Sequence, residues 1–137
     1  MQNKENIIKY NGKTMEQYIE DGLEEFEYDE ISLWDILWET NYFRLNKKET
    51  NEFIFMNIVK MIEFGAKVVL PSDKKQYVLV ITDRYGITPE EIAKNIMKDL
   101  EKDKSIAERF GGVAFAAVNN GGYEMINDDG KVYLKYI

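Results

Sequence analysis

Residues 47–64 read KKETNEFIFMNIVKMIEF, and this stretch decides the fold. Apolar residues cover most of the circumference of the helix that their spacing predicts. Asn46 is placed to cap the start of this helix, and Gly65 is placed to end it. A helix that is apolar nearly all round is usually packed on more than one side. We therefore expect residues 47–64 to form the central helix.

The chain downstream of this helix carries hairpin signals and one further helix. Residues 67–70 and 76–82 predict two strands joined by the loop PSDKK, and the apolar run YVLVI places the second strand inside the sheet. Thr88, Pro89 and Glu91 fit the N-cap, N1 and N3 positions of a helix that runs to about residue 102.

The C-terminal quarter predicts strands separated by tight turns. A helical turn at 105–110 is followed by the breaker Gly111-Gly112. The segments VAFAAV, YEMI and KVYLKYI then predict three strands, joined by NNGG and NDDG. This pattern indicates a C-terminal β-meander.

Two helices are predicted upstream of residue 46. Thr14 is a candidate N-cap for a first helix with apolar residues at helical spacing. Ser32 begins SLWD, a capping box in which the third helical position holds Asp35 in place of the usual, longer glutamate. The helix LWDILWETNYF follows. We expect residues 28–31 to be a connection and residues 7–10 to be a short strand.

This order of elements is typical of the α+β class. The expected fold has N-terminal helices, then a hairpin, a helix and the C-terminal β-meander, in a mostly antiparallel sheet with helices on one face. The length of 137 residues fits a single globular domain over 1–137, with residues 1–5 loosely ordered. The residues expected to be largely buried are Phe55, Ile58, Val59, Ile62, Val78, Val80, Ile92, Ile96, Ala114 and Ala116.

The composition excludes much of the common catalytic chemistry. The sequence has no histidine and no cysteine, so it contains neither the usual general base nor a thiolate nucleophile or ligand. The segment NDDGK lacks the alternating ligands of a calcium loop and is better interpreted as a turn. We therefore expect no enzymatic activity, no catalytic residues, no metal site and no cofactor.

Charge is distributed unevenly along the chain. The net charge is −7, and residues 1–45 account for all of it, with eleven acids and four bases. The stretch EDGLEEFEYDE (20–30) holds seven carboxylates and no base. One interpretation is a solvated acidic face; the other is a surface for a cationic partner. The candidate partner-binding residues are Glu20, Asp21, Glu24, Glu25, Glu27, Tyr28, Asp29 and Glu30.

The chain resembles the small cytosolic immunity proteins that bacteria encode beside contact-dependent and other polymorphic toxins. The likeness lies in size, acidity, element order and lack of catalytic apparatus. It also lies in ISLWDILWE, a long apolar helix ending EFGA, a hairpin, and TPEEI opening a helix. This resemblance implies tight, stoichiometric binding of one cognate toxin, often a basic nuclease, and it carries over no residue roles.

Two other functions fit the same features. An acidic secretion chaperone of the type III kind is also small and α+β, and is usually dimeric. An acidic inhibitor from a mobile element, which mimics nucleic acid, shares the physics of an immunity protein but differs in its target. Binding to nucleic acid itself is disfavoured, because acids match the basic residues that would neutralise phosphates.

The expected location is the cytoplasm, because the sequence shows no signal peptide and no apolar run long enough to span a membrane. No membrane partner is expected. The expected partner is a cognate toxin or another basic protein, and the expected assembly is a monomer or a weak dimer.

Overall fold

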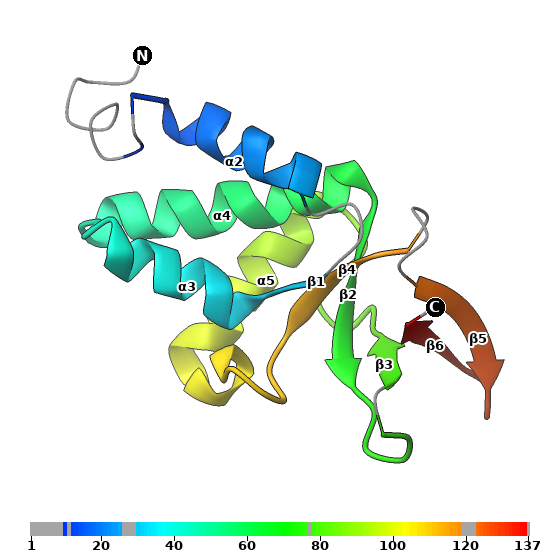
Figure 1. The fold of residues 1–137 in the computed structure, drawn as a ribbon. Helices are drawn as coiled ribbons and strands as arrows, with labels where there is room; N and C mark the ends of the chain where they lie inside the picture. Colours follow the sequence, from blue (N-terminus) through cyan, green and yellow to red (C-terminus); the bar gives the residue numbers. More distant parts are fainter. Residues whose placement is uncertain (1–9, 11, 26–29, 77, 119–122, 137) are drawn as a thin grey trace.

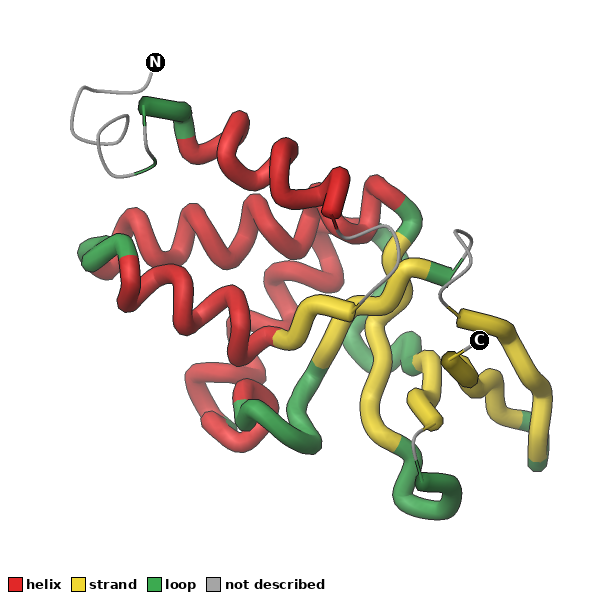
Figure 2. The backbone as a smooth tube through the Cα atoms, in the orientation of Figure 1, coloured by secondary structure: helices red, strands yellow, loops and turns green. Residues whose placement is uncertain are grey.

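The computed structural model describes the chain except for residues 1–9, 11, 26–29, 77, 119–122 and 137. Over the described residues it contains four α-helices and a six-stranded antiparallel sheet, so the predicted α+β class is confirmed. The helices gather at one side of the molecule and the strands at the other (Figure 1, Figure 2). The predicted strand at 7–10 and the loose order of residues 1–5 fall outside the described residues, Tyr10 excepted.

The helices begin and end where the local chemistry predicts. The helices are α2 (Met15–Glu25), α3 (Leu33–Tyr42), α4 (Lys47–Phe64) and α5 (Pro89–Lys102), with a 3-10 turn, η2, at Lys104–Ala107. Both Ser32 and Asn46 form complete capping boxes, in which side chain and backbone groups three residues apart exchange hydrogen bonds. Gly65 ends α4 with a φ of 113°, a left-handed conformation that favours glycine.

The strands form one sheet in the order β1-β4-β2-β3-β6-β5. Their bounds are β1 (Glu30–Ser32), β2 (Ala66–Pro71), β3 (Val78–Ile81), β4 (Ala114–Ala117), β5 (Tyr123–Asp128) and β6 (Lys131–Tyr136). The predicted β2–β3 and β5–β6 hairpins are confirmed. Asp129 and Gly130 both have positive φ, as a two-residue hairpin turn requires.

Two details of the predicted strand pairing are wrong. The strand β4 does not pair with β5 in a three-stranded meander; it lies between β1 and β2, at the other side of the sheet. Glu30 and Ile31 are not a connection, because they pair with Ala116 and Phe115 as the edge strand β1. Both errors concern contacts between distant segments, which turn residues and local propensity do not encode.

The sheet separates two clusters of buried side chains. Alternate residues of a strand point to opposite faces, so Val68 and Phe115 pack against the helices while Val69 and Ala114 face the other way. The second cluster is closed by residues of the C-terminal strands, including Leu134. The helices thus cover one face of the sheet, as predicted.

The predicted core is confirmed for half of its members. Buried residues include Ile58, Ile92, Ile96, Ala114 and Ala116. The other five are only partly buried: Phe55, Val59, Ile62, Val78 and Val80. Phe55 and Val59 line an open groove on α4, and the main contacts between helices and sheet are those of α3 with β1 and of α4 with β2.

Replacing Phe115 by alanine should lower the free energy of unfolding by about 3–5 kcal/mol, because its ring is fully buried between sheet and helices. The matched control is Phe110→Ala, whose ring is 81% exposed and whose loss should change stability by less than about 0.5 kcal/mol. Urea unfolding followed by circular dichroism measures both. Equal losses for the two variants would contradict this core.

Candidate binding surface

The helix α2 presents the first part of the acidic stretch to solvent. Its apolar residues Met15, Ile19 and Leu23 are buried, because they recur on one side of the helix. The opposite side carries four exposed carboxylates, from Glu16, Glu20, Asp21 and Glu24.

Two lysines partly neutralise this face. The ammonium of Lys13 lies 2.5 Å from a carboxylate oxygen of Asp21. Lys60, which comes from α4, lies 3.2 Å from Glu16 and 3.0 Å from Glu20. The hydrogen bond from Lys60 to Glu20 is the main reason why the pKa of the lysine is raised. The stretch itself contains no base, but folding brings Lys60 of α4 to it.

The remaining candidate residues divide into three groups. Glu27, Tyr28 and Asp29 lie outside the described residues. Glu25 is the last residue of α2, but the structure does not describe the placement of its side chain. Glu30 is exposed on the edge strand β1.

A cavity of about 450 Å³ brings two of the predicted carboxylates together with one that the sequence analysis missed. It lies where α2, α3, α4 and β1 meet, and Asp21, Glu30 and Glu39 all line it. The other polar groups of the cavity come from Lys13, Tyr18 and Asn57. The rest of its lining consists of Ile19, Gly22, Leu23 and Ile31. Glu39 could not be assigned to this group from sequence, because it belongs to the next helix.

Glu39 is held by a hydrogen bond across the cavity wall. The hydroxyl of Tyr18 on α2 donates to its carboxylate on α3. Burial raises the pKa of the Glu39 carboxyl above its ordinary value of 4.5, while the Tyr18 hydrogen bond opposes that shift. Burial also raises the pKa of Tyr18. This pair ties α2 to α3 through a partly buried hydrogen bond, and a hydrogen bond to a charged group is stronger than one between neutral groups.

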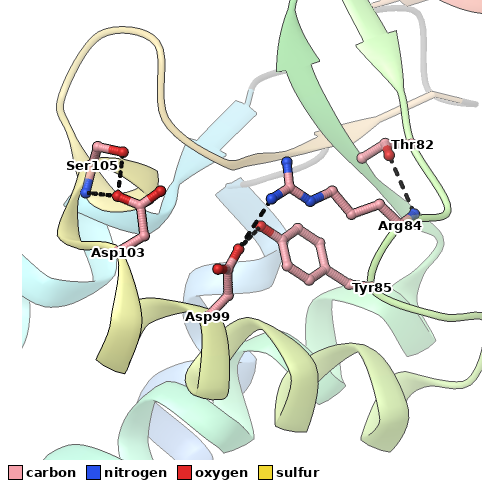
Figure 3. Close-up of polar contacts among 6 residues, drawn as sticks. All are labelled: Thr82, Arg84, Tyr85, Asp99, Asp103 and Ser105. Atoms are coloured by element: carbon pink, nitrogen blue, oxygen red, sulfur yellow. Dashed lines mark hydrogen bonds and ion pairs between the residues drawn. The ribbon is translucent and has the colours of Figure 1, made fainter.

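A second polar cluster joins the loop after β3 to the end of α5 (Figure 3). Asp99 accepts hydrogen bonds from the hydroxyl of Tyr85 at 2.6 Å and from Nη2 of Arg84 at 3.3 Å. The pKa of Tyr85 is raised to about 12, mainly by burial and to a lesser extent by the hydrogen bond to Asp99. Some residues of this cluster line a cavity of about 480 Å³, with Asp73 and Gly112 among its other walls.

A separate hydroxyl–carboxylate pair, formed by Ser105 and Asp103, caps the 3-10 turn η2. Asp103 accepts hydrogen bonds from the Ser105 backbone at 3.0 Å and from its Oγ at 2.5 Å, at the start of η2 (Figure 3). These bonds lower the pKa of Asp103, which makes it a weaker base. A short-range contact of this kind is the ordinary way in which a helical turn begins.

Exposed aromatic residues lie on the outer side of α3. The ring of Trp38 is 51% exposed and stacks on Tyr42 at a centroid distance of 5.3 Å. Trp34, one turn earlier, is half-buried beneath the guanidinium of Arg109, which lies 5.1 Å from its ring centre. The four-residue spacing of these side chains marks one helix face, but which rings stay exposed depends on the neighbouring elements.

Comparison with protein-family models, with curated proteins and with solved structures gave no match. Within the described part of the chain, no cluster of three or more acidic side chains has a geometry suited to a metal ion. The described helices include none that is both long and apolar enough to cross a membrane.

Replacing Tyr18 by phenylalanine should destabilise the protein most at neutral pH, by about 1.5–3 kcal/mol, because the charged Glu39 then loses its donor. The raised pKa of Glu39 means that its contribution to stability falls as pH rises above 4.5. Without Tyr18 the pKa should rise further and this fall should steepen. Urea unfolding above and below pH 4.5, with Tyr42→Phe as the exposed control, measures the effect. A loss independent of pH would show that Tyr18 acts through packing alone.

Proposed function

We propose that the protein is a non-catalytic binding protein that inhibits a basic protein, as immunity proteins inhibit their toxins. The observation that supports this proposal is the exposed acidic side of α2, in a chain whose net charge of −7 comes from its first third. Salt bridges to Lys13 and Lys60 are exposed or partly exposed, and such pairs contribute little to stability. A cationic partner can therefore compete for these carboxylates at low cost.

The physical benefit of such a surface is fast and selective association. Complementary charge raises the rate of encounter and disfavours acidic partners. The same field repels nucleic acid, so the proposed partner is a basic protein, of which a nuclease-type toxin is one kind. On this proposal the protein acts in the bacterial cytoplasm, and the carboxylates of α2 occupy cationic groups that the partner needs for its own substrate.

The proposal that the chain has no catalytic activity rests on its side-chain inventory. It lacks histidine and cysteine. Among the described residues, the hydroxyl–carboxylate contacts of Tyr18, Tyr85 and Ser105 tie or cap secondary structure elements. None of these contacts places a base beside an activated nucleophile.

A secretion chaperone is the second candidate function, and one observation favours it. Met125, Val132 and Tyr136 are 52%, 36% and 62% exposed on the β5–β6 hairpin. The strand register places all three on the same face of the sheet. An exposed apolar face on a stable homodimer is what a chaperone for an extended segment needs. A monomer that captures a folded basic protein would instead support the first proposal.

Affinity capture with the tagged protein should retain a basic protein at low salt, and adding salt should slow association, because the Debye length falls from about 10 Å at 0.1 M to about 3 Å at 1 M. The charge-reversed variant Glu20→Lys/Asp21→Lys/Glu24→Lys should bind at least about tenfold more weakly. The captured protein should lose its own activity on binding.

The matched control reverses Glu90, Glu101 and Glu108, which are exposed on or near α5. Asp99 and Glu91 are unsuitable controls, because Asp99 holds Arg84 and Tyr85, and Glu91 accepts a hydrogen bond from the Ile87 backbone. If the two triple variants bind equally well, the acidic side of α2 is a solvated face and not a partner-binding surface. Capture of an acidic protein alone would refute the proposal.

A further inference from the structure

The outer face of α4 forms a shallow apolar groove of about 280 Å³. Its floor consists of Phe55, Met56 and Val59, which are all half-buried. The three floor residues recur at helical spacing. The groove extends from Glu52 to Glu63, which is three helical turns or roughly 16 Å. These side chains pack against the helical core, but they leave part of their apolar surface exposed at the groove.

The charges that line the groove are unbalanced. Glu52 and Glu63 are exposed at its two ends. The cation in its lining, Lys60, is already bonded to Glu16 and Glu20 of α2. Beyond Lys60 therefore lies the acidic side of α2, so the groove offers carboxylates at both ends and along one side.

We propose that this groove binds a basic amphipathic helix of the partner protein, with its apolar side chains on Phe55, Met56 and Val59 and its lysines or arginines on the surrounding carboxylates. The inference rests on the proposed function, since it assumes a basic protein partner, and it adds the surface and the secondary structure recognised. A straight floor with residues at i, i+1 and i+4 suits the ridges of a second helix packed about 8–10 Å away.

Charge argues against a second copy of this chain as the occupant. Two copies joined through this groove would bring Glu52 and Glu63 of one onto the acidic surroundings of the other. Like charges facing each other across an interface disfavour association. A basic helix removes that repulsion and covers the apolar floor at the same time.

The probe for this inference is a fluorescently labelled synthetic peptide of leucine and lysine, about 14 residues long, with its leucines at helical spacing. It should bind the wild-type protein, gain helical structure, and shift the amide resonances of residues 52–63 in heteronuclear NMR spectra. A peptide of the same composition with strict alternation of leucine and lysine should bind roughly tenfold more weakly, because its apolar face forms only as a strand.

Two variants locate the site, and a third controls for charge. Glu52→Lys/Glu63→Lys changes only exposed residues and should weaken peptide binding roughly tenfold. Val59→Lys should weaken it at least as much by removing the floor. Glu90→Lys/Glu101→Lys has the same change in net charge on α5 and should weaken binding less than about twofold. If Val59→Lys unfolds, the Glu52/Glu63 variant still decides the result.

Three results would overturn the inference. The first is equal weakening by the two double variants. The second is amide shifts confined to α2, which would leave the basic-partner proposal intact but move the surface away from α4. The third is concentration-dependent self-association in sedimentation that Val59→Lys removes, which would make a second copy the occupant. Affinity capture of the natural partner tests the proposed function separately, because it does not depend on this peptide.

Discussion

Packing around α4 governs the rest of the structure. The helices α2, α3 and α5 and the strand β2 all contact α4. Its side chains Phe53 and Ile58 are fully buried. A capping box at Asn46 and the left-handed Gly65 fix where it starts and ends, so the hairpin that follows leaves at a defined point. Because α2 packs on α4, the position of the acidic side of α2 follows from the same contacts.

The strand β4 connects the helical layer to the second core. It is short and rich in alanine, and it pairs with β1 on one side and β2 on the other. Phe115 points into the helical cluster, while Ala114 and Ala116 belong to the cluster on the opposite face. Phe115 is the one large side chain of this strand, and its fully buried ring lies in the helical cluster together with Ala117.

The exposed carboxylates of α2 lie next to the apolar groove of α4. The acidic side of α2 and the apolar groove of α4 are joined through Lys60, which contacts both Glu16 and Glu20. Interfaces depend on a few anchoring residues surrounded by polar contacts. A groove with an apolar floor and carboxylate surroundings has that composition, whereas acidic residues alone would provide encounter without anchoring.

Local chemistry was sufficient to predict the helix ends, the β2–β3 and β5–β6 hairpins and the α+β class. Caps such as Ser32, Asn46 and Thr88 satisfy backbone groups within three or four residues of themselves. The sequence also determined the net charge and its concentration in the first third. Tertiary structure alone decided that β4 inserts between β1 and β2, that Lys60 reaches the acids of α2, and that Glu39 joins Asp21 and Glu30 at one cavity. Those contacts join residues that lie far apart in the chain, and their formation depends on how the helices and the sheet bury their apolar faces together, which no local pattern specifies.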